Sequence, residues 1–264
     1  MCFGCQENQN SHDFQIVILG SSTAAGSGPS SSDSTWVNRY RKFLQEINPN
    51  NLVTNLAIGG TTTYHIMPDW FAAAPNRPAS NPSNNVSQAI ALGADAIIVN
   101  MPSNDASNNF GIDEQMFNFQ MIAAVADSAD IPVWNCTTQP KTAFGATQDA
   151  IQLGVRDSIF STFGNRALDF WNGIALPSND IDPIFDSGDG THLNDAAHAV
   201  LFGRVRDKNI LSEIFQPALG TDFAMGNYEI LNPKLCGDPE TIIQGEIVNL
   251  AEDDFSDIYI VHDI

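Results

Sequence analysis

An aspartate stands three residues before a histidine in the segment "SGDGTHLND", residues 187–195. One short turn between Asp189 and His192 lets the carboxylate meet the imidazole, which would fix the histidine tautomer and stabilise the imidazolium. Of the five histidines in the chain, this one has an acid beside it directly before a helical pattern. The spacing alone does not establish catalysis, but with a nucleophile nearby it suits general acid–base chemistry.

Three other polar segments follow apolar runs that we expect to form strands. Ser22 lies in "GSSTAAGSG" (20–28), which matches neither a P-loop nor a dinucleotide-binding glycine pattern. Gly60 lies in "NLAIGGTTTY", where paired glycines permit a positive φ and could turn a backbone N–H into a site. Asn104 lies in "NMPSNDA" and carries an amide donor. Each segment taken alone also fits an ordinary turn.

The elements that must position these residues alternate between apolar strands and helical patterns. Such alternation indicates a mostly parallel sheet with right-handed crossovers and helices on both faces. We therefore expect an α/β fold, a three-layer flavodoxin-like sandwich with about five strands. The expected strands are 14–20, 51–58, 94–101, 131–137 and 167–171, and the expected helices are 34–47, 113–127, 147–162 and 194–215.

In sheets of this kind, ligands bind beyond the carboxyl ends of the strands, so the four polar segments should meet at one rim. Together they supply the components of acyl transfer. Ser22 would be the nucleophile, His192 the base and Asp189 the residue that orients the base. The backbone N–H groups of Ser22 and Gly60 and the side chain of Asn104 would form the oxyanion hole.

These residues resemble the four sequence blocks of the SGNH hydrolases, also called GDSL-type esterases. The resemblance covers about residues 14–217 and implies that Ser22, Gly60, Asn104 and His192 are the four residues that name the superfamily. Two positions depart from its pattern. Ser21 stands where the family has aspartate in the first block, and Pro102 stands where the third block usually has glycine.

The resemblance implies a serine esterase that works through an acyl-enzyme and needs no metal or other cofactor. We expect short-chain acetyl esters, and specifically a carbohydrate O-acetylesterase, because hydroxyl and aromatic side chains follow the oxyanion glycine. Thr61, Thr62, Tyr64 and His65 are the expected substrate-binding residues. The alternatives are a lipid or short-chain acyl esterase or thioesterase, and a non-catalytic carbohydrate-binding surface protein on the same fold. The departures at Ser21 and Pro102 favour the last of these.

The net charge and the lengths of the apolar runs indicate which partners are excluded. Eleven basic against 31 acidic residues give a net charge of −20. This surface repels phosphate backbones and anionic headgroups, so we expect no nucleic-acid partner. No run approaches the roughly 18 apolar residues of a transmembrane span.

The two ends differ in composition from residues 14–217, which we expect to form the catalytic domain. Residues 1–13 predict a tether, and the polar run after Cys5 resembles the start of a bacterial lipoprotein, which would place the chain at a periplasmic or outer surface. The Cys2–Cys5 spacing also permits a redox or metal pair. Residues 218–264 hold ten acidic residues and one basic residue, Lys234. We expect an acidic, β-rich appendage there, whose carboxylates could bind calcium or form a solvated face.

Overall fold

The computed structural model describes residues 13–142 and 144–215. The strands are β1 (Gln15–Gly20), β2 (Leu52–Asn55), β3 (Ala96–Asn100), β4 (Val133–Cys136) and β5 (Ala167–Leu168). The α-helices are α1 (Ser22–Ala25), α2 (Trp36–Ile47), α3 (Val86–Ala91), α4 (Asn104–Ser107), α5 (Ile112–Asp127), α6 (Ala146–Phe163), α7 (Asp195–Asp207) and α8 (Ile210–Phe215). Three short 3-10 helices are η1 (Ser32–Ser34), η2 (Thr63–Ile66) and η3 (Gly164–Arg166).

The five strands form one sheet in the order β2-β1-β3-β4-β5, and every neighbouring pair is parallel. The prediction of a mostly parallel sheet of about five strands is therefore confirmed. All carboxyl ends of the strands lie at the same edge, where the chain enters the loops that carry the predicted site residues.

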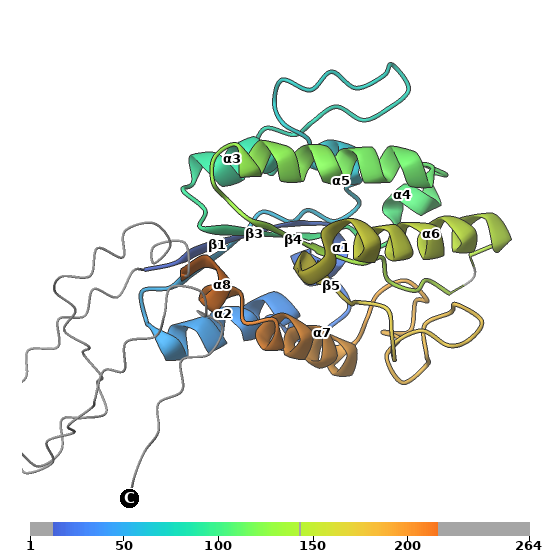
Figure 1. The fold of residues 1–264 in the computed structure, drawn as a ribbon. Helices are drawn as coiled ribbons and strands as arrows, with labels where there is room; N and C mark the ends of the chain where they lie inside the picture. The colour runs from blue at the N-terminus through green and yellow to red at the C-terminus, as the bar shows by residue number, and fades with distance from the viewer. Residues whose placement is uncertain (1–12, 143, 216–264) are drawn as a thin grey trace, which may run out of the picture. The chain divides into compact units, whose positions relative to one another are not determined.

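Helices cover both faces of this sheet (Figure 1). Along β1, Ile16 and Ile18 pack with apolar residues of α2, α7 and α8, whereas Val17 and Leu19 pack with those of α3, α5 and α6. Because successive side chains of a strand point to opposite faces, a sheet covered on both sides needs continuous apolar strands. The run "QIVILG" satisfies this requirement, and each of these four side chains is fully buried.

Helix α2 shows how local sequence sets the bounds of an element. The Thr35 hydroxyl accepts a hydrogen bond from the Asn38 N–H and so caps the start of the helix. One face of the helix is buried, but Ile47 at the last turn is 57% exposed.

Several predicted elements differ from those observed. The helix expected over 194–215 is two helices, because Asn209 adopts a left-handed φ of 54° between α7 and α8. The strands expected over 51–58 and 167–171 are shorter. In each case the chain leaves the sheet early to form loops. The sequence patterns did not indicate α3, α4 or η2.

All but the last residue of the N-terminal tether, with Cys2 and Cys5, and the whole C-terminal appendage, with Lys234, lie outside the described residues. In the described ranges, no helix combines the length and apolar character needed to cross a bilayer. Within the same ranges, no group of three or more His, Cys, Asp and Glu side chains is arranged to hold a metal ion.

Candidate active site

The predicted nucleophile stands at a tight strand-to-helix turn. Ser22 is the first residue of α1, directly after β1, and it is half-buried. A Cβ on Gly20 would lie 2.7 Å from the Ala24 Cβ and 2.9 Å from the Asn100 carbonyl oxygen, so this turn requires glycine. The Ser22 hydroxyl makes no hydrogen bond to another residue of the described ranges, which leaves its oxygen available to a base and a substrate.

The Gly59–Gly60 turn lies beside Ser22. A Cβ on Gly59 would be 3.7 Å from the Ser22 Cβ, while one on Gly60 would meet nothing within 4 Å. Gly60 has a φ of +83°, a conformation that favours glycine. The structure thus brings the turn that contains Gly60, the predicted second-block glycine, close to Ser22.

Asn104 joins the first and second loops through its side-chain amide. Its Nδ2 donates to the Ser21 hydroxyl at 2.6 Å and to the Thr61 carbonyl oxygen at 2.8 Å. Because a carbonyl oxygen can only accept, the second contact fixes which way the amide faces. The donor group of Asn104 is therefore directed at the junction between the Ser22 and Gly60 segments.

Asp189 and His192 form the predicted couple. The imidazole Nδ1 lies 2.6 Å from one carboxylate oxygen, and the other oxygen accepts the backbone N–H groups of Thr191 and His192, each at 2.8 Å. Partial burial alone would raise the pKa of Asp189, but the hydrogen bonds from His192 and Thr191 outweigh it and hold the pKa below its usual range. The ionised carboxylate keeps the proton on Nδ1 and leaves Nε2 as the basic nitrogen.

Close packing links this couple to the nucleophile loop. A Cβ on Gly28 would lie 2.2 Å from the Leu193 carbonyl oxygen and 3.1 Å from the His192 Cβ. Two residues later, the Ser30 N–H donates to the Asp195 carboxylate at 2.7 Å. The structure shows no hydrogen bond between Ser22 and the His192 ring, a contact that often tightens only when substrate is bound.

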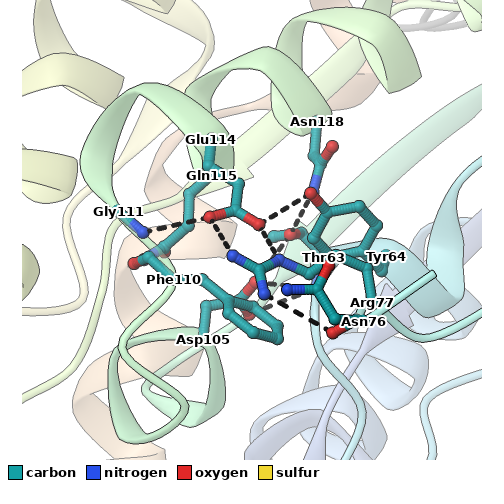
Figure 2. A network of polar contacts seen from close by, with 10 residues as sticks. All are labelled: Thr63, Tyr64, Asn76, Arg77, Asp105, Phe110, Gly111, Glu114, Gln115 and Asn118. Carbon is teal, nitrogen blue, oxygen red and sulfur yellow. Dashed lines mark hydrogen bonds and ion pairs between the residues drawn. The ribbon is translucent and has the colours of Figure 1, made fainter. Parts of the chain in front are cut away.

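A buried carboxylate that the sequence analysis did not select lies behind this site. Asp105 follows Asn104 and is 3% exposed. It accepts the Thr63 N–H at both oxygens, at 3.1 and 3.0 Å, and the Thr63 hydroxyl at 2.6 Å (Figure 2). Burial raises the pKa of Asp105 to about 6, although the hydrogen bonds from Thr63 act in the opposite direction. The sequence signal that could have identified Asp105 is its position directly after Asn104.

A second group of contacts ties η2 and the 68–85 loop to Glu114 of α5. The Tyr64 hydroxyl and the Arg77 guanidinium both donate to Glu114, and the Arg77 guanidinium also lies 4.4 Å from the centre of the Phe110 ring (Figure 2). The hydrogen bond with Arg77, reinforced by that with Tyr64, holds the pKa of Glu114 below its ordinary value despite partial burial.

The four residues predicted to bind substrate follow Gly60, and three of them are buried. The hydroxyls of Thr61, Thr62 and Tyr64 contact the Gly20 carbonyl oxygen, the His65 ring and Glu114, respectively. His65 is half-buried, and its Nδ1 accepts the Thr62 N–H at 3.0 Å. Burial is the main cause that holds the pKa of His65 below its ordinary value. Their contact with substrate stays a prediction.

Two further side chains that could carry chemistry are buried in the fold. Cys136 is fully buried. His198 is also fully buried, and its Nδ1 accepts the N–H of Trp36 at 3.1 Å. Burial lowers the pKa of His198 to about 4, so the ring is neutral near pH 7.

Comparison with known protein families identifies this arrangement. Residues 18–200 match the model of the GDSL-like lipase/acylhydrolase family, and this match covers more than half of the chain. The chain belongs to this family. The match spans the sequence from β1 to α7 and includes every residue predicted for the active site. No curated protein matches the chain.

Solved structures with the same fold include three esterases or lipases. A GDSL-like lipase from Bacteroides thetaiotaomicron is 17% identical, with 77% of this chain and 88% of that chain covered and a TM-score of 0.52. Esterase EstA from Pseudoalteromonas is 16% identical, with 77% and 100% covered and a TM-score of 0.52. An acetyl xylan esterase is 13% identical, with 74% and 100% covered and a TM-score of 0.55. Membership of the GDSL-like family, with neighbours of this kind, supports esterase activity.

Proposed function

We propose that this GDSL-like protein is a serine esterase that removes acetyl groups from carbohydrates through an acyl-enzyme. One observation carries the proposal: the Asp189–His192 couple packs on Gly28 just after α1, while Asn104 donates to Ser21, directly before Ser22 at the start of α1. These contacts support acyl transfer, which needs a nucleophile, a base with its orienting acid and oxyanion donors.

In the first step, the Ser22 hydroxyl oxygen attacks the ester carbonyl carbon and its proton passes to Nε2 of His192. The carbonyl oxygen becomes an oxyanion, which the N–H groups of Ser22 and Gly60 and the side chain of Asn104 would stabilise. The two hydrogens of the Asn104 amide contact Ser21 and Thr61, so Asn104 would share one of them with the oxyanion. The bond to the leaving oxygen then breaks, that oxygen takes the proton from His192, and the acyl group stays on Ser22.

In the second step, water attacks the acyl-enzyme and gives its proton to His192. A second oxyanion forms in the same hole and collapses. The bond to Ser22 breaks, and the serine oxygen recovers the proton from the imidazole. Asp189 stabilises the imidazolium in both steps and does not itself take the proton.

The choice of an acetylated carbohydrate has three supports. The acetyl xylan esterase shares the fold along its whole length. Hydroxyl, aromatic and imidazole groups follow the oxyanion glycine, and His65 is the least buried of the four predicted there. The net charge of −20 disfavours anionic lipid surfaces, which weakens the case for a lipid substrate.

Acetate release from acetylated xylan, together with turnover of p-nitrophenyl acetate and octanoate, tests this proposal. We expect acetate release, a preference for the acetyl ester, and loss of both activities in Ser22→Ala. Ser31→Ala, which changes an exposed serine of the same loop, should match the wild type. A preference for octanoate would favour the lipid esterase, and failure of a fluorophosphonate to label Ser22 would favour the non-catalytic alternative.

A further inference from the structure

Two loops that carry the proposed oxyanion donors are joined by a buried carboxylate that no step of the reaction uses. Asp105 directly follows Asn104, and its partner Thr63 lies three residues after Gly60. We propose that Asp105 is a positioning residue of the oxyanion hole, which acts through Thr63 to hold the Gly60 N–H and the Asn104 amide at a fixed separation. This inference rests on the proposed function.

Asp105 accepts hydrogen bonds from both the backbone and the side chain of Thr63. The Thr63 backbone N–H reaches both carboxylate oxygens, and the Thr63 hydroxyl donates to one of them at 2.6 Å. Thr63 is fully buried and Asp105 is 3% exposed, so water does not compete for these bonds. Hydrogen bonds to a charged group of this kind contribute more than neutral ones do.

Asn118 of α5 fixes the direction of the contact. Its Nδ2 donates to the Thr63 hydroxyl at 2.8 Å (Figure 2). Because Asn118 supplies a hydrogen there, the Thr63 hydroxyl uses its own hydrogen toward Asp105. The carboxylate thus receives a donor at each of its contacts with Thr63, and η2 is held against α4 and α5.

A second bond runs between the same two loops. Asn104 donates to the Thr61 carbonyl oxygen at 2.8 Å, so residues 61 and 63 are both attached to residues 104–105. Two attachments, two residues apart, restrain rotation as well as translation of the Gly60 turn relative to Asn104. This precision matters because a misplacement of about 1 Å at a catalytic group can cost about 10²-fold in rate.

Three variants separate positioning from general stability. Thr63→Val removes the hydroxyl and keeps the size of the side chain, whereas Thr63→Ser keeps the hydroxyl. Asn118→Ala removes a buried hydrogen bond to the same threonine but leaves the contact with Asp105 in place. All three change fully buried side chains, so their melting temperatures provide a common scale of disruption.

The measurements are kcat and KM for p-nitrophenyl acetate and the inhibition constant of phenylboronic acid, which adds to a serine as a tetrahedral anion. For Thr63→Val, we expect kcat and boronate affinity to fall together by about tenfold while KM changes less than twofold. Thr63→Ser should restore both values. Asn118→Ala should lower the melting temperature but keep more than half of kcat.

Equal losses of kcat in Thr63→Val and Asn118→Ala at similar melting temperatures would show a merely structural role and overturn the inference. Should Thr63→Val fail to fold, Asp105→Asn supplies the test, because its amide donors would face the N–H and hydroxyl of Thr63 and should reduce boronate affinity. If the wild type is active and Thr63→Val has the same kcat and boronate affinity, this inference is overturned while the proposed function stands. A wild type that neither hydrolyses acetate esters nor reacts with fluorophosphonate overturns the proposed function as well.

Discussion

Asn104 donates one hydrogen of its side-chain amide to the hydroxyl of Ser21, at 2.6 Å. Ser21 occupies the position of the aspartate in the GDSL pattern and is fully buried. The hydroxyl therefore still supplies an acceptor where the pattern has a carboxylate, and it does so without a negative charge beside the proposed oxyanion hole. Ser21 thus provides a neutral hydrogen-bond acceptor for Asn104 at this position.

Replacement of Asn104 tests the oxyanion role directly. Asn104→Ala removes the amide donor and should lower kcat for p-nitrophenyl acetate by about 10²–10³-fold, since loss of one such donor has this cost. KM should change little, because the interaction strengthens only as charge develops on the carbonyl oxygen. Steady-state kinetics on the purified variant, with the exposed Asn50→Ala as control, measure the effect. If KM rises in the variant while kcat stays unchanged, Asn104 acts in substrate binding instead.

Gly28 provides a test of how the His192 segment is held. Gly28→Ala would force a Cβ to 2.2 Å from the Leu193 carbonyl oxygen at a φ of +106°. We expect the 192–193 backbone to shift, with a lower melting temperature and at least a tenfold loss of kcat.

Gly93→Ala is the matched control for this change. Gly93 also has a positive φ, +72°, but nothing lies within 4 Å of its Cβ position. The Gly93→Ala variant should lose about 1–2 kcal/mol of unfolding free energy from the backbone conformation alone and keep its activity. Full activity in Gly28→Ala would mean that this contact does not position His192.

The sheet could be predicted from the sequence because every residue of β1 that is buried is also apolar. An unbroken apolar strand such as "QIVILG" indicates a sheet covered on both faces, and the amphipathic pattern around Tyr40 indicates a helix that packs on one of them. The candidate catalytic residues could also be identified from the sequence, because each of them follows the end of a predicted strand or precedes a predicted helix.

The supporting contacts could not be predicted in this way. Asp105 and Thr63 are 42 residues apart, and neither belongs to a periodic pattern that marks the pair. Helices of four residues, such as α4, are too short to show a helical repeat. The break at Asn209 depends on a single left-handed residue within an otherwise helical pattern, so 194–215 reads as one helix.

The Asp189–His192 contact predicts a specific effect of removing the negative charge. Asp189→Asn keeps the size of the side chain but offers a neutral partner to Nδ1, so His192 loses both its tautomer preference and the stabilisation of its imidazolium. We expect kcat to fall by about 10³–10⁴-fold at pH 7, as such a change does in a catalytic triad. The pH dependence of kcat/KM supplies the measurement. Activity within tenfold of the wild type would place the orienting acid elsewhere.

His198 predicts how stability changes with acidity. Its pKa is lowered by burial to about 4 in the folded protein, against about 6.5 in an unfolded chain. The unfolded chain therefore takes up the proton first, and the contribution to stability, complete above pH 6.5, is lost as the pH falls toward 4. A shift of this size corresponds to about 3 kcal/mol of unfolding free energy.

Comparison of the wild type with His198→Asn isolates this effect. The asparagine carbonyl oxygen can accept the Trp36 N–H in place of Nδ1, and it does not titrate. Asp105 titrates in the opposite sense, because its raised pKa of about 6 favours the folded state on acidification, but it is present in both proteins. Urea unfolding at pH 7 and pH 4.5 should therefore show a larger loss of stability in the wild type. Equal losses in the two proteins would mean that His198 is not held neutral in the fold.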